Sequence, residues 1–321
     1  MKKQQLIKTF ASITMCLPAL GQSIEMALSG PVSGVYFAVQ QKALLPIRGI
    51  PGSATFASPL LSGVDLAAVS TSGNRALISK EGSIFLVGGL RGSSPSTTLL
   101  PTLASFEQVA WSPDSSKAVI NSFNGGLSIL DGSSLEPVQV NGRVKSVAIT
   151  DSGPIVASVD GASSGIYLAK KGKEPVLLSA LDQPSDVVLD AKGLRAFVLD
   201  NASNSIQVVE IGAESPSISV IPLIAAEGSE YGGIATAKDS AFLLVLNKGL
   251  RQIEVYNLPG GGLDSKLALD FPPTKFQRIA GGGLLALSGT GTNQALYVLD
   301  TADQFRISFI PAVTNRNAEE F

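Results

Sequence analysis

The chain has 321 residues, of which 45% are hydrophobic and 16% charged, and its formal net charge is −2. This near balance of basic and acidic residues gives no sign of the positive surface that nucleic-acid binding requires, so no nucleic-acid partner is expected. The sequence contains no histidine, which excludes Ser-His-Asp and Cys-His catalysis and every metal site with an imidazole ligand. Enzymes that use Asp, Glu, Lys or Tyr remain open, as do Ca²⁺ sites built from oxygen ligands.

The N-terminal segment has the pattern of a secretory signal peptide. Lys2, Lys3 and Lys8 supply a positive region, and an apolar stretch runs from Leu6 to Leu20. That stretch has the length of a signal's hydrophobic region and is short for a membrane span, which needs about 20 apolar residues. Ala19-Leu20-Gly21 offers small residues for a cleavage site, and Gly21-Gln22-Ser23 is a second option. We therefore expect a signal peptide at 1–23 and one secreted or periplasmic domain at 24–321, without a transmembrane segment in the mature chain.

Two other interpretations of this segment stay open. A buried N-terminal helix is disfavoured by the lysines and by the polar Gly21-Gln22-Ser23 that follows the apolar stretch. A lipoprotein would be anchored at Cys16, the only cysteine, but Met15 stands where a small residue is normal. Cleavage after the signal would leave no cysteine, so the stability of the mature chain must come from packing rather than from disulfides.

One sequence unit recurs along the rest of the chain. Its clearest copy, Val109–Ile120, consists of an apolar strand, a Pro-Asp-Ser turn and a second β-branched run. Related copies occupy Val69–Ser79, Ala148–Val159, Val188–Leu199, Ala235–Leu246 and Arg278–Ser288. Their turns fall near Gly73, Ser115, Gly153, Gly193, Ser240 and Gly282. These turns are roughly 38 to 47 residues apart, a spacing typical of the four-stranded blades of a propeller.

A second hairpin follows each copy, with more alternation between apolar and polar residues, as in outer, half-exposed strands. These hairpins begin at Ser83, Leu127, Gly165, Ser205, Gln252 and Ala295. Each unit therefore predicts an inner a–b hairpin followed by an outer c–d hairpin, which is a propeller blade.

The predicted fold class is all-β, a β-propeller of four-stranded blades. The hairpin at Gly34–Ile50 matches the c–d pattern, which gives six complete blades plus an N-terminal half-blade and leaves a total of six or seven blades open. The last blade has its own c–d pair, which ends near Pro311. The way in which the ring closes is therefore not predicted.

Two segments resemble known bacterial propellers. WSPDSSKAVI, Trp111 to Ile120, resembles the turn of the YVTN, NHL and TolB-like (WD-like) repeats. Ala191 to Glu210 is similar to the YVTN unit, in which a Lys-Arg turn precedes an Asn-rich stretch. The resemblance covers most of the mature chain and implies the fold, but it implies little about function.

Polar residues in the predicted b–c loops are the candidates for ligand binding at the channel mouth: Asn124, Asp160, Asn201 and Asn247. Their oxygens suit Ca²⁺ or a sugar, although Asn and Asp are also common in turns. Propellers of the gluconolactonase type use Glu, Asn and Asp around a metal, and Glu107 and Glu230 are the nearest glutamates here. Trp111 is predicted in the core or the channel wall. Arg278, Arg251 and Arg143 are candidates for the rim of the mouth, although isolated arginines on a surface are usually only solvated.

Together these observations favour an extracytoplasmic scaffold that binds a protein or a cell-envelope saccharide and has no catalytic activity. No cofactor is expected, although a bound Ca²⁺ stays open. The alternative is a divalent-metal-dependent, lactonase-like hydrolase.

Overall fold

The structure, a computed structural model, describes residues 32–311 except 93, 102, 104, 124–125, 154, 212–215, 280–282, 290–294 and 303. Contacts divide the chain into Met1–Gly30 and Pro31–Phe321, and the description concerns the second unit. The predicted signal peptide at 1–23 lies outside the described residues. Within the described ranges, no helix is long and apolar enough to cross a membrane.

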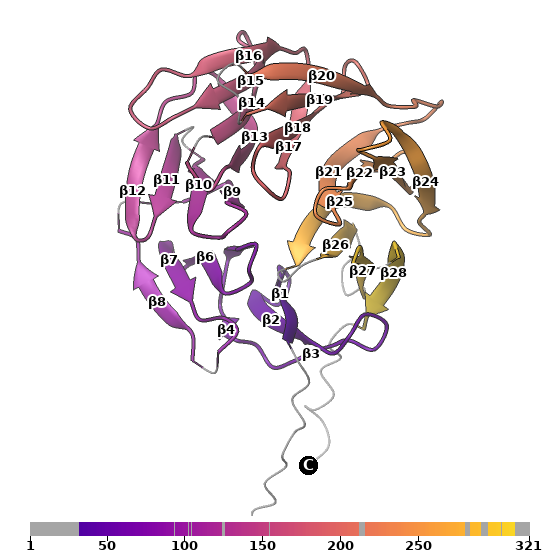
Figure 1. The fold of residues 1–321 in the computed structure, drawn as a ribbon. Coiled ribbons are helices and arrows are strands. Elements are labelled where there is room, and N and C mark those ends of the chain that lie inside the picture. Colours follow the sequence, from indigo (N-terminus) through magenta and orange to yellow (C-terminus); the bar gives the residue numbers. More distant parts are fainter. Residues whose placement is uncertain are drawn as a thin grey trace, which may run out of the picture. The chain divides into compact units, whose positions relative to one another are not determined.

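The described residues form seven antiparallel sheets of four strands each (Figure 1). The first contains β1 (Val32–Ala38), β2 (Ala43–Arg48), β3 (Thr55–Phe56) and β4 (Leu61–Ser62). The second and third contain β5 (Leu66–Val69), β6 (Arg75–Lys80), β7 (Ser83–Gly88), β8 (Ser96–Leu99), then β9 (Gln108–Trp111), β10 (Lys117–Asn121), β11 (Leu127–Asp131) and β12 (Ser134–Val138). The fourth and fifth contain β13 (Arg143–Ile149), β14 (Ile155–Asp160), β15 (Gly165–Ala169), β16 (Val176–Ala180), then β17 (Pro184–Leu189), β18 (Arg195–Asp200), β19 (Ser205–Glu210) and β20 (Ser217–Pro222). The last two contain β21 (Tyr231–Ala237), β22 (Phe242–Asn247), β23 (Gln252–Asn257), β24 (Gly262–Ala268), then β25 (Pro273–Ile279), β26 (Leu284–Gly289), β27 (Leu296–Asp300) and β28 (Arg306–Ile310).

These sheets are the blades of a ring. Each innermost strand contacts the innermost strand of the next blade, from β1 through β5, β9, β13, β17 and β21 to β25, and β25 contacts β1. The predicted fold class is confirmed, and of the two blade counts left open the structure has seven. The predicted c–d hairpins of the last six blades are confirmed as the paired outer strands from β7–β8 to β27–β28.

The assignment of the N-terminal hairpin to an outer c–d pair is wrong. Its first strand, β1, is the innermost strand of the first blade, so β1 and β2 are an a–b pair. The outer positions are held by β3 and β4, strands of two residues that both pair with β2. The first blade therefore stands in place of the predicted half-blade. The pattern was misleading because its turn, at Val39–Lys42, lacks the Asp, Ser and Gly residues of the other a–b turns.

The predicted turn positions are confirmed wherever the structure describes them. Gly73, Ser115, Gly153, Gly193 and Ser240 all have positive φ, between 63° and 106°, and all lie in a–b connections. Gly permits this conformation without steric cost, and at the Ser positions the surrounding turn enforces it. The sixth predicted position, Gly282, is outside the described residues.

The ring closes by apolar packing between the first and last blades. Ile47 and Ala54 of the first blade form one buried cluster with Ile279, Val298 and Ile310 of the seventh. Among the described residues, strands β25 to β28 pair only with one another, so the last blade takes no strand from the first. Closure therefore depends on side-chain burial rather than on a strand shared between the two ends of the described chain.

Candidate functional site at the a–b end of the channel

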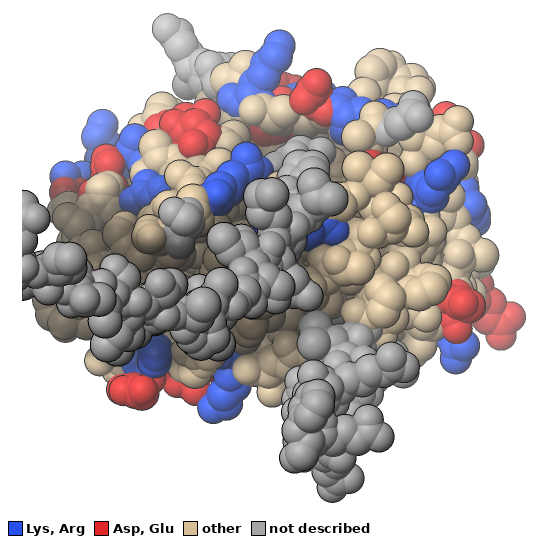
Figure 2. All heavy atoms as spheres, turned by 90° about the horizontal axis from the view of Figure 1, so that it is seen from below, with Lys and Arg blue, Asp and Glu red and all other residues tan. Residues whose placement is uncertain are grey.

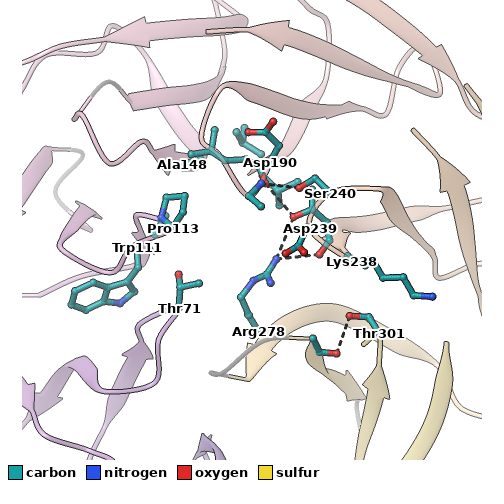
Figure 3. Close-up of a pocket in the computed structure, with 18 of the residues that line it drawn as sticks. Thr71, Trp111, Pro113, Ala148, Asp190, Lys238, Asp239, Ser240, Arg278 and Thr301 are labelled. Atoms are coloured by element: carbon teal, nitrogen blue, oxygen red, sulfur yellow. Dashed lines mark hydrogen bonds between the residues drawn. The ribbon is translucent and has the colours of Figure 1, made fainter. Parts of the chain in front are cut away.

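One cavity lies at the end of the channel where the a–b turns gather. Its volume is about 530 Å³, within the range of about 300–1,000 Å³ typical of ligand pockets. The wall comes from the C-terminal ends of the inner strands and from their turns, in blades two to seven (Figure 3). Residues used below are Trp111, Ala191, Thr236, Lys238, Asp239 and Arg278.

The repeated turn sequence holds the rim of this cavity together. The Asp114 amide donates to the carboxylate of Asp151 in the next blade at 3.0 Å, and the Ala191 amide donates to Ser240 Oγ of its neighbour at 2.7 Å. The Ser72 amide donates in the same way to Ser115 Oγ at 2.8 Å. The Asp and Ser residues of the repeat therefore join adjacent blades, which explains their recurrence without a role in chemistry.

Arg278 supplies a cation to the cavity. Its Nη2 donates to the carbonyl oxygen of Thr236 at 3.2 Å and to Thr236 Oγ1 at 3.4 Å. The side chain is exposed to the cavity, yet the surrounding ring removes it from bulk water, and this desolvation lowers the pKa of Arg278. The guanidinium stays charged at neutral pH because its ordinary pKa is so high. Among the described residues, no carboxylate lies within ion-pair distance of it.

The other charged residues of the cavity differ in their surroundings. Asp190 is buried and accepts from Arg195 Nε at 3.2 Å as well as from two backbone amides. Lys238 Nζ lies 4.9 Å from the ring centroid of Phe305, and in Figure 3 its side chain points away from Arg278. Asp239 is an ordinary exposed residue of the same turn. The cavity therefore contains one cation whose described hydrogen-bond acceptors are neutral.

An aromatic and apolar wall lies across the cavity from Arg278. Trp111 ends the inner strand of the third blade, and its Nε1 donates to the Ala68 carbonyl at 3.1 Å. The guanidinium of Arg75 lies 5.4 Å from the indole centroid, which fixes the ring further. The prediction that Trp111 lies in the core or the channel wall is confirmed. Figure 3 shows Trp111 and Arg278 on different sides of the cavity.

A chain of hydrogen bonds links the inner strands of four consecutive blades. Gln108 Nε2 donates to Ser146 Oγ at 3.3 Å, and Ser146 Oγ donates to Asp186 Oδ1 at 3.1 Å. Asp186 Oδ2 accepts from the Ile234 amide at 3.0 Å. Desolvation raises the pKa of Asp186, although the donors around it act in the opposite direction. This chain fixes the inner strands relative to one another and so supports the cavity wall.

The sequence candidates that the structure describes, Asp160, Asn201 and Asn247, lie at b–c connections and do not line this cavity. Asn124 is outside the described residues. Asp160 ends β14, and Lys145 Nζ donates to it at 3.1 Å and lowers its pKa. Asn201 follows β18, and its Oδ1 is buried without a described partner. These positions share one end of neighbouring blades, and no described hydrogen bond joins them to each other. Ligand binding there stays a prediction.

Asn247, the fourth candidate, belongs to a buried hydrogen-bond network. Its side chain is 0% exposed. Its Oδ1 accepts from the amides of Glu230 and Leu250, both at 3.2 Å, while Nδ2 donates to Glu254 Oε1 at 3.2 Å. Tyr256 donates to the same buried carboxylate at 3.0 Å. Burial and the charge of Glu254 raise the pKa of Tyr256, so this hydroxyl remains a donor.

The glutamates considered for a metal site lie apart from the cavity. The Glu107 amide donates to the carbonyl oxygen of Asn121 at the end of β10, and the Glu230 carboxylate pairs with Lys248 at 2.6 Å. Within the described ranges, no three acidic or thiol side chains converge as metal ligands would.

Sequence reasoning named Arg278 among three candidates for the rim of the mouth, but it missed the cavity. The inner strands that build it are far apart in the chain, and no spacing between single residues marks them. One signal was available, because every repeat ends its inner strand just before an a–b turn, which places Trp111 and Arg278 at equivalent ends of two blades.

Figure 2 shows basic and acidic side chains interspersed on the flank that it presents. That distribution gives this flank no single-sign field of the kind that steers nucleic acid.

No protein-family model matches the chain, and no curated protein sequence does. Many solved structures share its fold. A protein from Lactobacillus plantarum has a TM-score of 0.61 at 15% identity, covering 88% of this chain and 96% of that one. A Bacteroides uniformis protein, provisionally described as a 6-phosphogluconolactonase, has a TM-score of 0.60 at 14% identity, covering 87% and 94%. The β-propeller domain of Cps50 (Swd1) from Myceliophteria thermophila has a TM-score of 0.55 at 13% identity, covering 82% and 95%. At such identities the likeness shows the β-propeller fold alone.

Proposed function

We propose that this protein is an extracytoplasmic binding scaffold and that its ligand occupies the cavity at the a–b end of the channel. Export is part of the proposal and rests on the lysines and apolar stretch at the N-terminus. Binding without catalysis rests on the cavity itself. Its buried acidic residue Asp190 is committed to Arg195 and the backbone, and Lys238 lies over an aromatic ring. Such fixed groups suit recognition, and the exposed carboxylate of Asp239 can accept a hydrogen bond from a ligand hydroxyl.

The observation that carries the proposal is the composition of the cavity wall. An aromatic side chain, Trp111, apolar residues such as Val187, and polar residues of the turns line one cavity. Ligand pockets combine a mainly apolar lining with a few convergent polar groups in this way. Of the two expected partner classes, a cavity of about 530 Å³ favours a saccharide unit over a protein surface.

Thermal unfolding with a panel of cell-envelope saccharides tests the proposal. A ligand that binds only the folded state raises the melting temperature by mass action. Ala191→Phe places a bulky side chain at an exposed position of the cavity rim. Its matched control is Ala162→Phe, also exposed but in a b–c turn. We expect a saccharide to raise the melting temperature of the wild type and the control, but not of Ala191→Phe. Equal responses in both variants would refute this site.

The metal-dependent hydrolase remains an untested alternative, because the likeness to a lactonase-like propeller concerns the fold only. It predicts a bound divalent ion and lactone hydrolysis that chelation abolishes.

A further inference from the structure

The charge of Arg278 is the feature of the cavity that the fold leaves uncompensated. Its described acceptors are the two oxygens of Thr236, both neutral. Asp190, which lines the same cavity, already pairs with Arg195 at 3.2 Å. The side chain of Arg278 is exposed to the cavity, so its remaining donors can reach a ligand there. The position of Arg278 therefore suits an anion bound in the cavity.

We propose that the cavity binds a saccharide that carries a carboxylate, and that this carboxylate pairs with the guanidinium of Arg278. The inference rests on the proposed function, since it names the chemical class of the ligand in that site. Donors on Nη1 and Nε of Arg278 have no described partner. A guanidinium with several donors in one plane matches the two oxygens of a carboxylate.

The charges of the wall favour a monoanion over a phosphate dianion. Asp239 lines the cavity together with Arg278, so a second negative charge on the ligand would face a carboxylate of the protein. The other cation in the cavity lining, Lys238, lies against the rings of Phe242 and Phe305, at 5.4 and 4.9 Å from their centroids. One negative charge is thus matched by Arg278, whereas two are not.

The rest of the ligand must suit a wall that is apolar on one side and polar on the other. Trp111 and Val187 offer apolar contact, and Thr71 and Asp239 are polar residues of the same lining. A pyranose ring has C–H groups for the first surface and hydroxyls for the second. Aromatic side chains with polar neighbours are well suited to such amphipathic ligands.

Calorimetric titration of the full chain with D-glucuronate, D-glucose and glucose 6-phosphate tests the inference. The first two sugars differ only at C6, where a carboxylate replaces a hydroxymethyl group, and the third tests a phosphate. We expect glucuronate to bind the wild type at least tenfold more tightly than either of the others. Arg278→Gln should weaken glucuronate binding roughly tenfold to hundredfold, as expected for a lost charge-assisted hydrogen bond. Arg278→Lys should give an intermediate loss.

Arg306→Gln, at an exposed position on the outer strand of the same blade, is the matched control and should bind glucuronate like the wild type. Circular dichroism confirms that each variant is folded, and the comparison of sugars in the wild type tests the inference even if Arg278→Gln does not fold. If glucuronate and glucose bind with equal affinity, and Ala191→Phe blocks both, the ligand is not recognised through a carboxylate. The cavity would still be the binding site. Tighter binding of glucose 6-phosphate would also overturn recognition through a carboxylate. Binding of no sugar, in this titration and in the saccharide panel, would overturn the proposed function as well.

Discussion

Arg278 Nη2 donates to the carbonyl oxygen of Thr236 at 3.2 Å and thereby joins the inner strands of the last two blades at the cavity wall. Thr236 Oγ1 in turn donates to the carbonyl of Leu189, on the inner strand of the fifth blade, at 3.1 Å. The residue proposed to recognise the ligand is therefore oriented by two neighbouring blades. Orientation of this kind lowers the entropy that a binding group loses when it engages its ligand.

Thr236→Val should weaken the site while preserving its shape. The substitution removes the hydroxyl that donates to Leu189 and accepts from Arg278. The lost hydrogen bonds should lower the free energy of unfolding by about 1–2 kcal/mol. Looser positioning of Arg278 should also weaken glucuronate binding severalfold in calorimetric titration. Thr97→Val, on the exposed strand β8, is the control and should change neither quantity. Unchanged affinity in Thr236→Val would show that Thr236 does not position the guanidinium.

Asp186 should give the stability of the wild type a dependence on pH. Desolvation raises its pKa in the folded protein above the unfolded value of about 3.9. At a pH between the unfolded and the folded pKa, the folded state binds more protons than the unfolded state. The free energy of unfolding therefore falls as the pH rises through the folded pKa. Asp186→Asn removes this titration and should flatten the decline, measured by urea unfolding from pH 4 to 8.

Asp264→Asn, on the exposed face of β24, provides the control and should keep the wild-type slope. Parallel slopes for the wild type and Asp186→Asn would mean that Asp186 titrates alike in the folded and unfolded states.

Ring closure should be sensitive to Ile279. This residue is 0% exposed and lies in the cluster that joins the last blade to the first. Ile279→Ala should lower the free energy of unfolding by about 2–5 kcal/mol, as for other buried Ile-to-Ala changes. Val220→Ala, at a position 54% exposed on an outer strand, should stay within about 0.5 kcal/mol of the wild type. A loss in Ile279→Ala no larger than that of Val220→Ala would contradict closure by apolar packing.

Much of the blade architecture could be predicted because turn chemistry is local. Gly193 and Ser240 mark their turns through positive φ, and the Asp or Ser residues beside them bond nearby backbone. The hairpin of β1 and β2 was misassigned because its turn, Val39–Lys42, lacks the Asp, Ser and Gly residues of the other a–b turns, although the continuous burial of Ala43 to Ile47 is that of an inner strand. The cavity depends on strands brought together only by ring closure, and apolar packing between Ile47 and Ile279 leaves no sequence motif.

Asn247 and Asp160 were both predicted at the ligand site, and their substitution should have different effects. Asn247→Ala leaves the buried amides of Glu230 and Leu250 without their acceptor. It should lower the free energy of unfolding by at least about 2 kcal/mol. Asp160→Ala removes only a partly exposed ion pair with Lys145, so it should change the free energy of unfolding little. Glucuronate should still bind Asp160→Ala with wild-type affinity, and a large loss of affinity there would favour the b–c end of the channel.

A metal requirement separates the scaffold from the hydrolase. The scaffold account expects the melting temperature of the full chain to be the same in EDTA and in Ca²⁺. The hydrolase account expects Ca²⁺ or another divalent ion to raise the melting temperature, because a ligand of the folded state stabilises it. A rise that EDTA reverses, together with lactone hydrolysis, would contradict the scaffold account.

The position of a bound sugar tests the central claim most directly. A crystal structure of the full chain with an oligosaccharide of glucuronate would show which end of the channel binds it. The account predicts density in the cavity between Trp111 and Arg278, with a carboxylate within hydrogen-bond distance of the guanidinium. Density beside Asp160 and Asn201 at the other end, or on the outer strands alone, would contradict it.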